Sequence, residues 1–262
     1  MDLQTILYDV ADNVAHIRLN NPGGANAVTP LFSRELRAAM LEAHIDDEVR
    51  AVCVTAEGKV FCAGGDLKLF AAEGERVGRV ASDMLTDYHG ALYRMNQMPK
   101  PVVAGVGGTA GGAGMSLVSA FDLVVASENA KFIMAYTKAG VTPDGTSTYF
   151  LARHVGVRRA LDLVLNNRML TAEEAERWGL VNRVVPEGEA DDAALAMAAE
   201  LAAGPGYALG HAKKLVYAGF DSTLPEAGER EAEVFLAASM HPDGLEGIAA
   251  FAAKRAPEFN RK

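Results

Sequence analysis

Hydrophobic and polar positions follow two different periods along the chain, and the period changes where one element gives way to the next. Short β-branched runs at 51–55, 102–106 and 123–125 predict buried strands, and each is followed by a glycine-rich or polar break. After Thr29 and the proline beside it, apolar residues recur at helical spacing, as expected for a helix with proline in its first turn. Alternating strands and helices predict an α/β fold with buried, mainly parallel strands.

Two further patterns describe the ends of this fold. Near the N-terminus, apolar residues on both sides of Asp12 and Asn13 predict a β-hairpin. Beyond the last strand signal, helical stretches follow one another, and one of them starts at Thr223 with the spacing of a capping box. We therefore expect residues 1–190 to form the α/β core and residues 191–262 to form a helical C-terminal region.

Composition narrows the class of protein. The 262-residue chain is half hydrophobic and has a formal net charge of -9, which argues against nucleic-acid or membrane-surface binding because those partners need a basic face. The uncharged stretch 101–121 is too rich in glycine for a membrane span. Cys53 and Cys62 form neither a disulfide framework nor a metal-ligand spacing, and the acidic first residues do not resemble a targeting signal. We expect a metal-free protein of the reducing cytoplasm.

Two glycine-rich turns are the strongest indication of chemistry. Gly64 and Gly65 follow one predicted strand, and the run 105–114 follows another and leads into an apolar helix. A dinucleotide-binding G-x-G-x-x-G spacing fails in the second run because Ala110 stands in place of the last glycine. Bare amides at such turns suit an oxyanion, whereas the plainer interpretation of the first turn is a strand-to-helix connection capped by Asp66.

Five sequence blocks occur in order along essentially the whole chain. The most specific are Phe-Cys-Ala-Gly-Gly-Asp-Leu at 61–67, Gly-Met-Ser-Leu at 114–117, and Phe-Ala-Ala-Lys-Arg-Ala-Pro-Glu-Phe at 251–259; blocks at 20–29 and 171–182 complete the set. Together they resemble the enoyl-CoA hydratase/isomerase (crotonase) superfamily. The resemblance implies a crotonase-like spiral of β-β-α turns, a homotrimer or dimer of trimers built through the helical C-terminal region, and an acyl-CoA thioester substrate. It implies no cofactor beyond the CoA of the substrate.

Matching the family's motifs residue by residue predicts how an acyl-CoA is held. The amides of Gly65 and Ala113 fall at the two positions that donate to the enolate oxygen in the family. Lys68, beside the first turn, and Lys254, in the terminal helix, are expected to meet CoA phosphates, the second from a neighbouring subunit; solvated surface charge is the alternative for both. The other expected substrate contacts are Ala63, Asp66, Leu67, Gly112, Ser116 and Tyr136.

The residues at the family's catalytic positions favour one reaction over another. Hydratases carry two glutamates where this chain has Ser116 and Tyr136, neither of which can act as a carboxylate base. Asp144 lies in the turn where isomerase branches carry an acidic residue, and the pattern is similar to the 1,2-epoxyphenylacetyl-CoA and 3-enoyl to 2-enoyl-CoA isomerases. The resemblance therefore implies an isomerase in which Asp144 shuttles one proton while the two amides stabilise the enolate.

The sequence leaves several alternatives open. Asp144 lies between a proline and a glycine, where an aspartate often caps the next helix. Ser116 lies on an apolar helix, where a serine often bonds its own backbone, and Tyr136 suits the lining of an acyl pocket. A hydratase and a non-catalytic acyl-CoA-binding protein are the competing functions. The histidines have no partner pattern and are expected at the surface or in packing.

Overall fold

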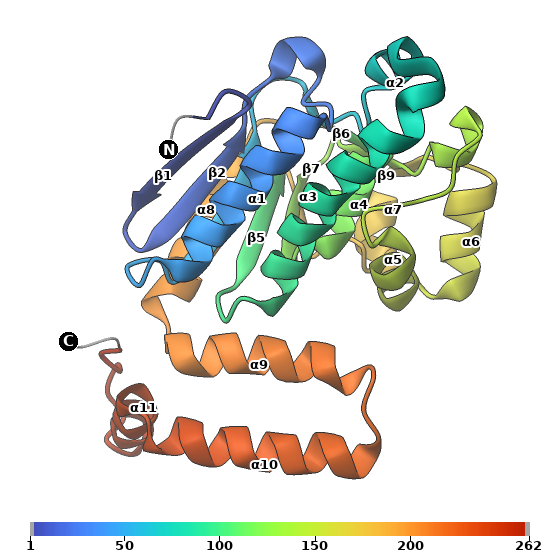
Figure 1. Cartoon of the computed structure of the whole chain (residues 1–262). Helices are drawn as coiled ribbons and strands as arrows, with labels where there is room; N and C mark the ends of the chain where they lie inside the picture. The colour runs from blue at the N-terminus through green and yellow to red at the C-terminus, as the bar shows by residue number, and fades with distance from the viewer. Residues whose placement is uncertain (1–2, 260–262) are drawn as a thin grey trace.

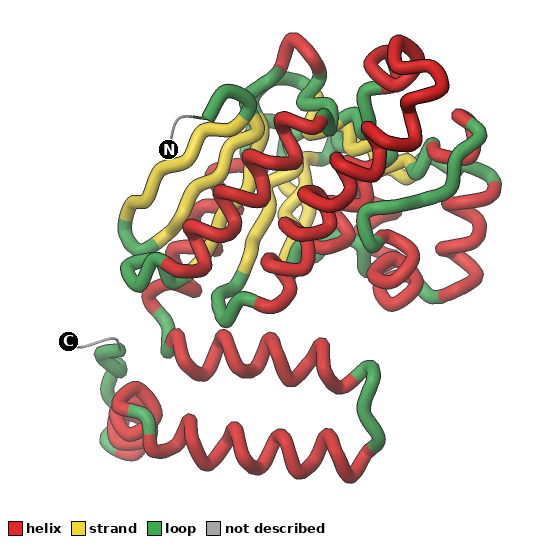
Figure 2. The backbone as a smooth tube through the Cα atoms, viewed as in Figure 1, coloured by secondary structure: helices red, strands yellow, loops and turns green. Residues whose placement is uncertain are grey.

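Two β-sheets lie among helices in this computed structural model, which describes residues 3–259 (Figure 1 and Figure 2). The larger sheet has the strand order β1 (Ile6–Ala11), β2 (Val14–Leu19), β3 (Ala51–Ala56), β5 (Val102–Val106), β7 (Leu123–Ser127) and β10 (Arg183–Val185). The smaller sheet has the order β4 (Val60–Cys62), β6 (Thr109–Gly111), β8 (Lys131–Ile133) and β9 (Leu170–Thr171).

Helices alternate with these strands and then continue without them. They are α1 (Pro30–Ile45), α2 (Leu67–Glu73), α3 (Val77–Gln97), α4 (Ala113–Ala120), α5 (Ser147–Val155), α6 (Val157–Leu165), α7 (Ala172–Trp178), α8 (Ala190–Ala203), α9 (Gly206–Gly219), α10 (Leu224–Met240) and α11 (Pro242–Ala252). A short 3-10 helix, η3 (Tyr136–Ala139), follows β8.

Pairing in the larger sheet is parallel apart from the first two strands. β3 pairs in parallel with β2 and β5, and β7 pairs in parallel with β5 and β10. β1 and β2 form the antiparallel hairpin, with φ of 49° at Asp12 and 63° at Asn13, the left-handed conformation that tight hairpin turns require. The predicted hairpin and the predicted mainly parallel α/β sheet are both confirmed.

The two faces of the larger sheet are covered by different helices. Alternate residues of a strand point to opposite faces, so Val52 and Val54 join the core beneath α1 and α3, while Ala51 and Cys53 join the one beneath α8. Alanines of α8 lie at every fourth position against this second face: Ala190, Ala194, Ala198 and Ala202. Although its sequence resembles the C-terminal helices, α8 therefore packs on the sheet (Figure 1).

The chain winds as a repeating turn between the two sheets. β3 leads into β4, β5 into β6 and β7 into β8, so each turn adds one strand to the larger sheet and one to the smaller before a helix returns the chain. This is the predicted spiral of β-β-α turns. It also brings the ends of β4, β6 and β8 together, because β6 pairs with both of the others.

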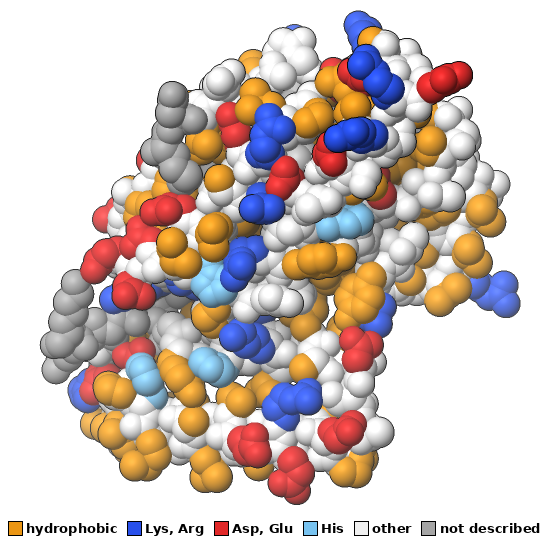
Figure 3. Space-filling model, in the orientation of Figure 1, with side chains coloured by type: hydrophobic (Ala, Val, Ile, Leu, Met, Phe, Trp, Pro, Cys, Tyr) orange, Lys and Arg blue, Asp and Glu red, His pale blue; other side chains and the backbone are white. Residues whose placement is uncertain are grey.

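The last three helices project from this body (Figure 1). α9 is attached by Lys213, whose Nζ lies 2.7 Å from Asp122 Oδ2, and by the Tyr217 hydroxyl, which donates to Asp122 Oδ1 at 2.9 Å. Apolar side chains reach the surface along α10 (Figure 3). The large exposed side chains of α10 and α11 are Leu224, Phe235, Leu236, Met240, Leu245, Ile248 and Phe251. Within residues 3–259 no helix is both long and apolar enough to cross a bilayer.

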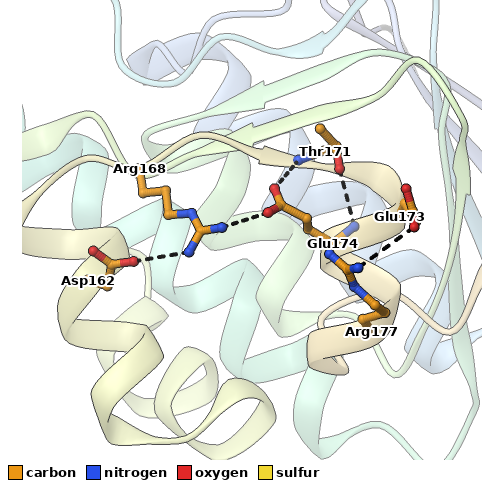
Figure 4. A network of polar contacts seen from close by, with 6 residues as sticks. All are labelled: Asp162, Arg168, Thr171, Glu173, Glu174 and Arg177. Carbon is orange, nitrogen blue, oxygen red and sulfur yellow. Dashed lines mark hydrogen bonds and ion pairs between the residues drawn. The ribbon is translucent and has the colours of Figure 1, made fainter.

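A polar network joins α6 to α7 across β9 (Figure 4). Arg168 lies 3.4 Å from the Asp162 carboxylate and 2.6 Å from Glu174 Oε1. Glu174 also accepts from the Thr171 amide while its own amide donates to the Thr171 hydroxyl, which is a capping box at the start of α7. The network fixes the segment that closes the smaller sheet.

Candidate active site

The first glycine turn directs one amide away from the Val28 segment that pairs with it. Gly65 forms an isolated parallel bridge with Val28, in which the Val28 amide donates to Gly64 O at 2.8 Å and the Asp66 amide donates to Val28 O at 3.2 Å. In such a bridge both bonds belong to Val28, so the Gly65 N–H faces the other side. Among the described residues this N–H has no backbone acceptor.

The second amide belongs to the first residue of α4. Ala113 has no carbonyl four residues back within its own helix, so its N–H is one of the bare donors of a helix start. The preceding Gly112 has φ of 49° and donates its amide to Ile133 O at 2.9 Å. All eight residues of α4 are buried, so the positive end of its dipole lies inside the protein rather than in water.

Only glycine allows these two turns to meet. A Cβ atom on Gly64, whose φ is +99°, would lie 3.1 Å from the Ala113 nitrogen and 2.7 Å from Gly111 O. A Cβ on Gly114 would lie 2.1 Å from Cys62 O. The backbones are therefore in direct contact, and the Gly65 and Ala113 amides lie close together, as a two-donor oxyanion hole requires.

A chain of two hydroxyl groups connects the helix that carries the second donor to a carboxylate. The Tyr136 hydroxyl donates to Asp144 Oδ1 at 2.5 Å, and Ser116 Oγ lies 2.9 Å from the Tyr136 oxygen. Ser116 is one turn along α4 from Ala113. A Cβ on Gly145 would lie 2.8 Å from Ser116 Cβ, so the Asp144 turn packs directly against α4.

The Asp144 carboxylate does not cap the helix that follows it, which was the alternative role for this residue. It is the Asp144 main-chain carbonyl that accepts from the Ser147 amide at 3.2 Å and from Ser147 Oγ at 2.8 Å. The N-cap of α5 is Thr146, and it makes no side-chain capping bond. By contrast, Asp66 does cap α2, accepting from the Lys68 and Leu69 amides at 3.0 Å.

Two residues of α3 complete the site, and neither was predicted from the sequence. The buried Tyr88 hydroxyl donates to Ala113 O at 2.6 Å and so fixes the peptide that follows the donor amide. His89 Nε2 accepts from the Gly145 amide at 3.1 Å, which requires the ring proton on Nδ1. No local spacing links residues 88–89 to the glycine turns, so only the packing of α3 reveals them.

Burial dominates the electrostatics of the site. It raises the pKa of the Asp144 carboxyl above its ordinary value, against the Tyr136 hydrogen bond, which lowers it; a positive charge on the nearby His89 ring would lower it as well. Burial also raises the pKa of Tyr136, so the phenol stays protonated as a donor. The pKa of the buried Cys62 thiol rises to about 12, which makes it a packing residue rather than a nucleophile. Asp144 is thus the group with the character of a base.

The other predicted contacts are spread more widely. Ala63, Leu67 and Lys68 are exposed beside the first turn, whereas Ser116 is fully buried. Lys254 was expected within the terminal helix, but α11 ends at Ala252, and Lys254 lies exposed beyond it with φ of 53°. In Figure 1 that end of the chain lies far from α2, so Lys254 and Lys68 of one chain do not share a site. The hollows along α9 are lined by none of these predicted substrate contacts.

In the described part of the chain, no three His, Cys, Asp or Glu side chains cluster as metal ligands would. What the site offers instead is two amide donors, one half-buried carboxylate and a hydroxyl pair. That set can bind a carbonyl oxygen that gains negative charge while a proton leaves or joins the neighbouring carbon.

The chain and its fold match those of known proteins. The profile of the family described as "Enoyl-CoA hydratase/isomerase" matches residues 9–262. A crystal structure of an enoyl-CoA hydratase from Polaromonas sp. JS666 superposes with a TM-score of 0.93 at 35% identity, covering 97% of this chain and 99% of the other. The chain belongs to the enoyl-CoA hydratase/isomerase family, and it is a crotonase-fold acyl-CoA enzyme.

Relatives of similar identity carry different activities in their names. A probable enoyl-CoA hydratase of Rhodobacter capsulatus is 37% identical over 259 residues, 99% of each chain. The 1,2-epoxyphenylacetyl-CoA isomerase of Escherichia coli is 33% identical over 261 residues, 99% of this chain and 100% of that one. A 4-chlorobenzoyl coenzyme A dehalogenase of Arthrobacter sp. is 34% identical over 253 residues, 95% and 91%. The family is therefore established, whereas the reaction has to be argued from the site.

Proposed function

We propose that the protein is an enoyl-CoA isomerase that moves a double bond from the 3- to the 2-position of an acyl-CoA thioester. The observation that carries the proposal is the single carboxylate beside the two amides. Asp144 lies there, while Ser116 and Tyr136 occupy the positions where the hydratases' two glutamates are expected. One carboxylate is enough to move a proton between two carbons of the same substrate.

The proposed reaction has two proton steps. Asp144 removes a proton from the carbon next to the thioester, and the electron pair becomes a dienolate whose oxygen accepts from the Gly65 and Ala113 amides. The protonated Asp144 then returns the proton to the fourth carbon, which leaves the double bond conjugated with the thioester. Each amide donor contributes roughly 2.7–4 kcal/mol to stabilising the transition state. The raised pKa of Asp144 matches this role, because a base that must also act as an acid works best when its pKa is not far below the working pH.

Hydration is the second candidate, since the relative from Rhodobacter capsulatus is named a probable hydratase. It would require Asp144 alone to orient and deprotonate water, without a second carboxylate among its hydrogen-bond partners. A protein that binds acyl-CoA without turnover is the third. One assay distinguishes the hydratase and the binding protein from the isomerase.

The assay follows absorbance with 3-hexenoyl-CoA and, separately, crotonyl-CoA. An isomerase converts the first into the conjugated 2-enoyl thioester and hydrates the second at no more than a small fraction of that rate. Rapid loss of crotonyl-CoA absorbance would assign a hydratase and contradict the proposal. Binding of both compounds with no turnover, including of a ring substrate such as 1,2-epoxyphenylacetyl-CoA, would point to a binding protein.

We also propose that the enzyme is a homotrimer, or a dimer of trimers, assembled through the projecting helices in the cytoplasm. No side chain of α10 is buried within one chain, although Phe235, Leu236 and Met240 are large and apolar. Apolar surface of this extent favours burial against another subunit. The two free, buried cysteines agree with a reducing compartment. We expect light scattering to give three or six times the chain mass of 27.7 kDa, and a monomer at micromolar concentration would contradict the proposal.

A further inference from the structure

We infer that Tyr136, oriented by Ser116, is a positioning residue that occupies one oxygen of Asp144 and leaves the other, Oδ2, as the atom that carries the proton. The inference rests on the proposed function, because it assigns a task to Asp144 within it. Its basis is the chain of hydrogen bonds from α4 through η3 to the Asp144 turn.

The direction of these hydrogen bonds follows from counting protons. A phenol has one proton, and Tyr136 lies 2.5 Å from Asp144 Oδ1, an acceptor that cannot donate when it is ionised. Tyr136 must therefore donate to Asp144. The single Ser116 proton can then go to Tyr136, 2.9 Å away, or to Gly112 O one turn back at 3.4 Å, and the shorter distance favours Tyr136. Both hydroxyl groups are buried, so water does not compete strongly for these protons.

The two oxygens of the carboxylate thereby become different. Oδ1 accepts the hydrogen bond from Tyr136, while no described group bonds to Oδ2. An oxygen that already accepts a short hydrogen bond is a weaker base, so the substrate proton goes to Oδ2. In the first step the bond from the 2-carbon to hydrogen breaks and Oδ2–H forms. In the second step Oδ2–H breaks and the bond from the 4-carbon to hydrogen forms, so one atom carries the same proton across one face of the substrate.

The Tyr136 hydrogen bond also sets the charge state of the base. It favours the ionised carboxylate and so opposes the effect of burial, which raises the Asp144 pKa. The other groups that face this turn come from α3: His89, whose ring would lower the Asp144 pKa only when it is positively charged, and the buried Tyr88, an uncharged phenol. Removing the Tyr136 hydroxyl should therefore raise the Asp144 pKa, and the base should lose its charge at a higher pH.

The test is the pH profile of kcat/KM for Tyr136→Phe. We expect the acid limb to move to higher pH, about a tenfold loss of kcat/KM on the acid side of the profile, a smaller loss on the plateau, and little change in KM. Ser116→Ala should move the limb in the same direction by less, because it weakens the phenol as a donor without removing it. Tyr149→Phe is the matched control: its hydroxyl bonds Asp221 outside the site, and its profile should be that of the wild type.

An unmoved acid limb in Tyr136→Phe, with a uniform loss of rate, would reduce Tyr136 to packing and overturn the inference. A second measurement separates this from failure of the proposed function. Infrared titration of the protonated carboxyl band that is absent in Asp144→Asn follows Asp144 without any substrate. If that band titrates at higher pH in Tyr136→Phe, the hydrogen-bond role stands even for a protein that does not isomerise; if the band does not move, the role is wrong.

Discussion

Replacing Asp144 with asparagine should lower kcat/KM for 3-enoyl-CoA isomerisation by roughly 10²- to 10⁴-fold, the usual contribution of a general base. Asparagine keeps the shape of the side chain and an oxygen that can accept from Tyr136, so the fold and the KM should change little. The loss should appear in kcat because a carboxamide cannot take up the substrate proton. Absorbance of the conjugated product measures it directly.

The matched control for this change is Asp221→Asn. Asp221 accepts from Tyr149 and pairs with Arg153 at 3.2 Å, 65% of its side chain is exposed, and it bonds none of the residues of the candidate site. Its variant should retain wild-type activity. If Asp144→Asn keeps its rate within about tenfold, another group acts as the base and the proposed mechanism is wrong.

Ala113→Pro should cost about 10²- to 10³-fold in kcat, because it deletes one oxyanion donor from the backbone itself. Proline has no N–H, and its ring puts carbon where the enolate oxygen should bind. The first position of a helix is also where proline is best tolerated, so α4 should survive the change. Steady-state kinetics and thermal unfolding of the same sample separate the two effects.

Val157→Pro supplies the control. Val157 is likewise the first residue of a helix after a glycine with positive φ, but it is 65% exposed and lies on α6, outside the site. Its variant should have wild-type kinetics. Wild-type turnover by a folded Ala113→Pro variant would mean that the oxygen is held elsewhere.

Local sequence was enough for most of the fold. The strand at Val102–Val106, the Thr29 N-cap of α1 and the capping box at Thr223 all lie where the spacing of residues placed them. These features depend on neighbours within a few positions. α8 differs, since alanines at every fourth position fit both a C-terminal helix and close packing on a sheet, and only the packing of the whole chain distinguishes the two.

The candidate site was predictable in part for the same reason. Gly65, Ala113 and Asp144 lie in short blocks that resemble a family, so their positions could be expected from sequence. The contact of Tyr136 with Ser116 joins residues 20 apart, and that of His89 with Gly145 joins residues 56 apart. Such contacts are set by the spiral, which brings successive turns of the chain side by side, and no local pattern encodes them.

The contact of the glycine turns has a consequence for how this protein can change over generations. Both amide donors belong to the backbone, so nearly every missense mutation in codons 65 and 113 leaves the donor group itself intact. In the proposed mechanism Asp144, Ser116 and Tyr136, by contrast, act through their side chains, so one base change in their codons would alter the chemistry of the site. On the proposed mechanism, a lineage with this fold would therefore acquire a new reaction on acyl-CoA thioesters by mutation at a few codons while it inherits the two amide donors unchanged.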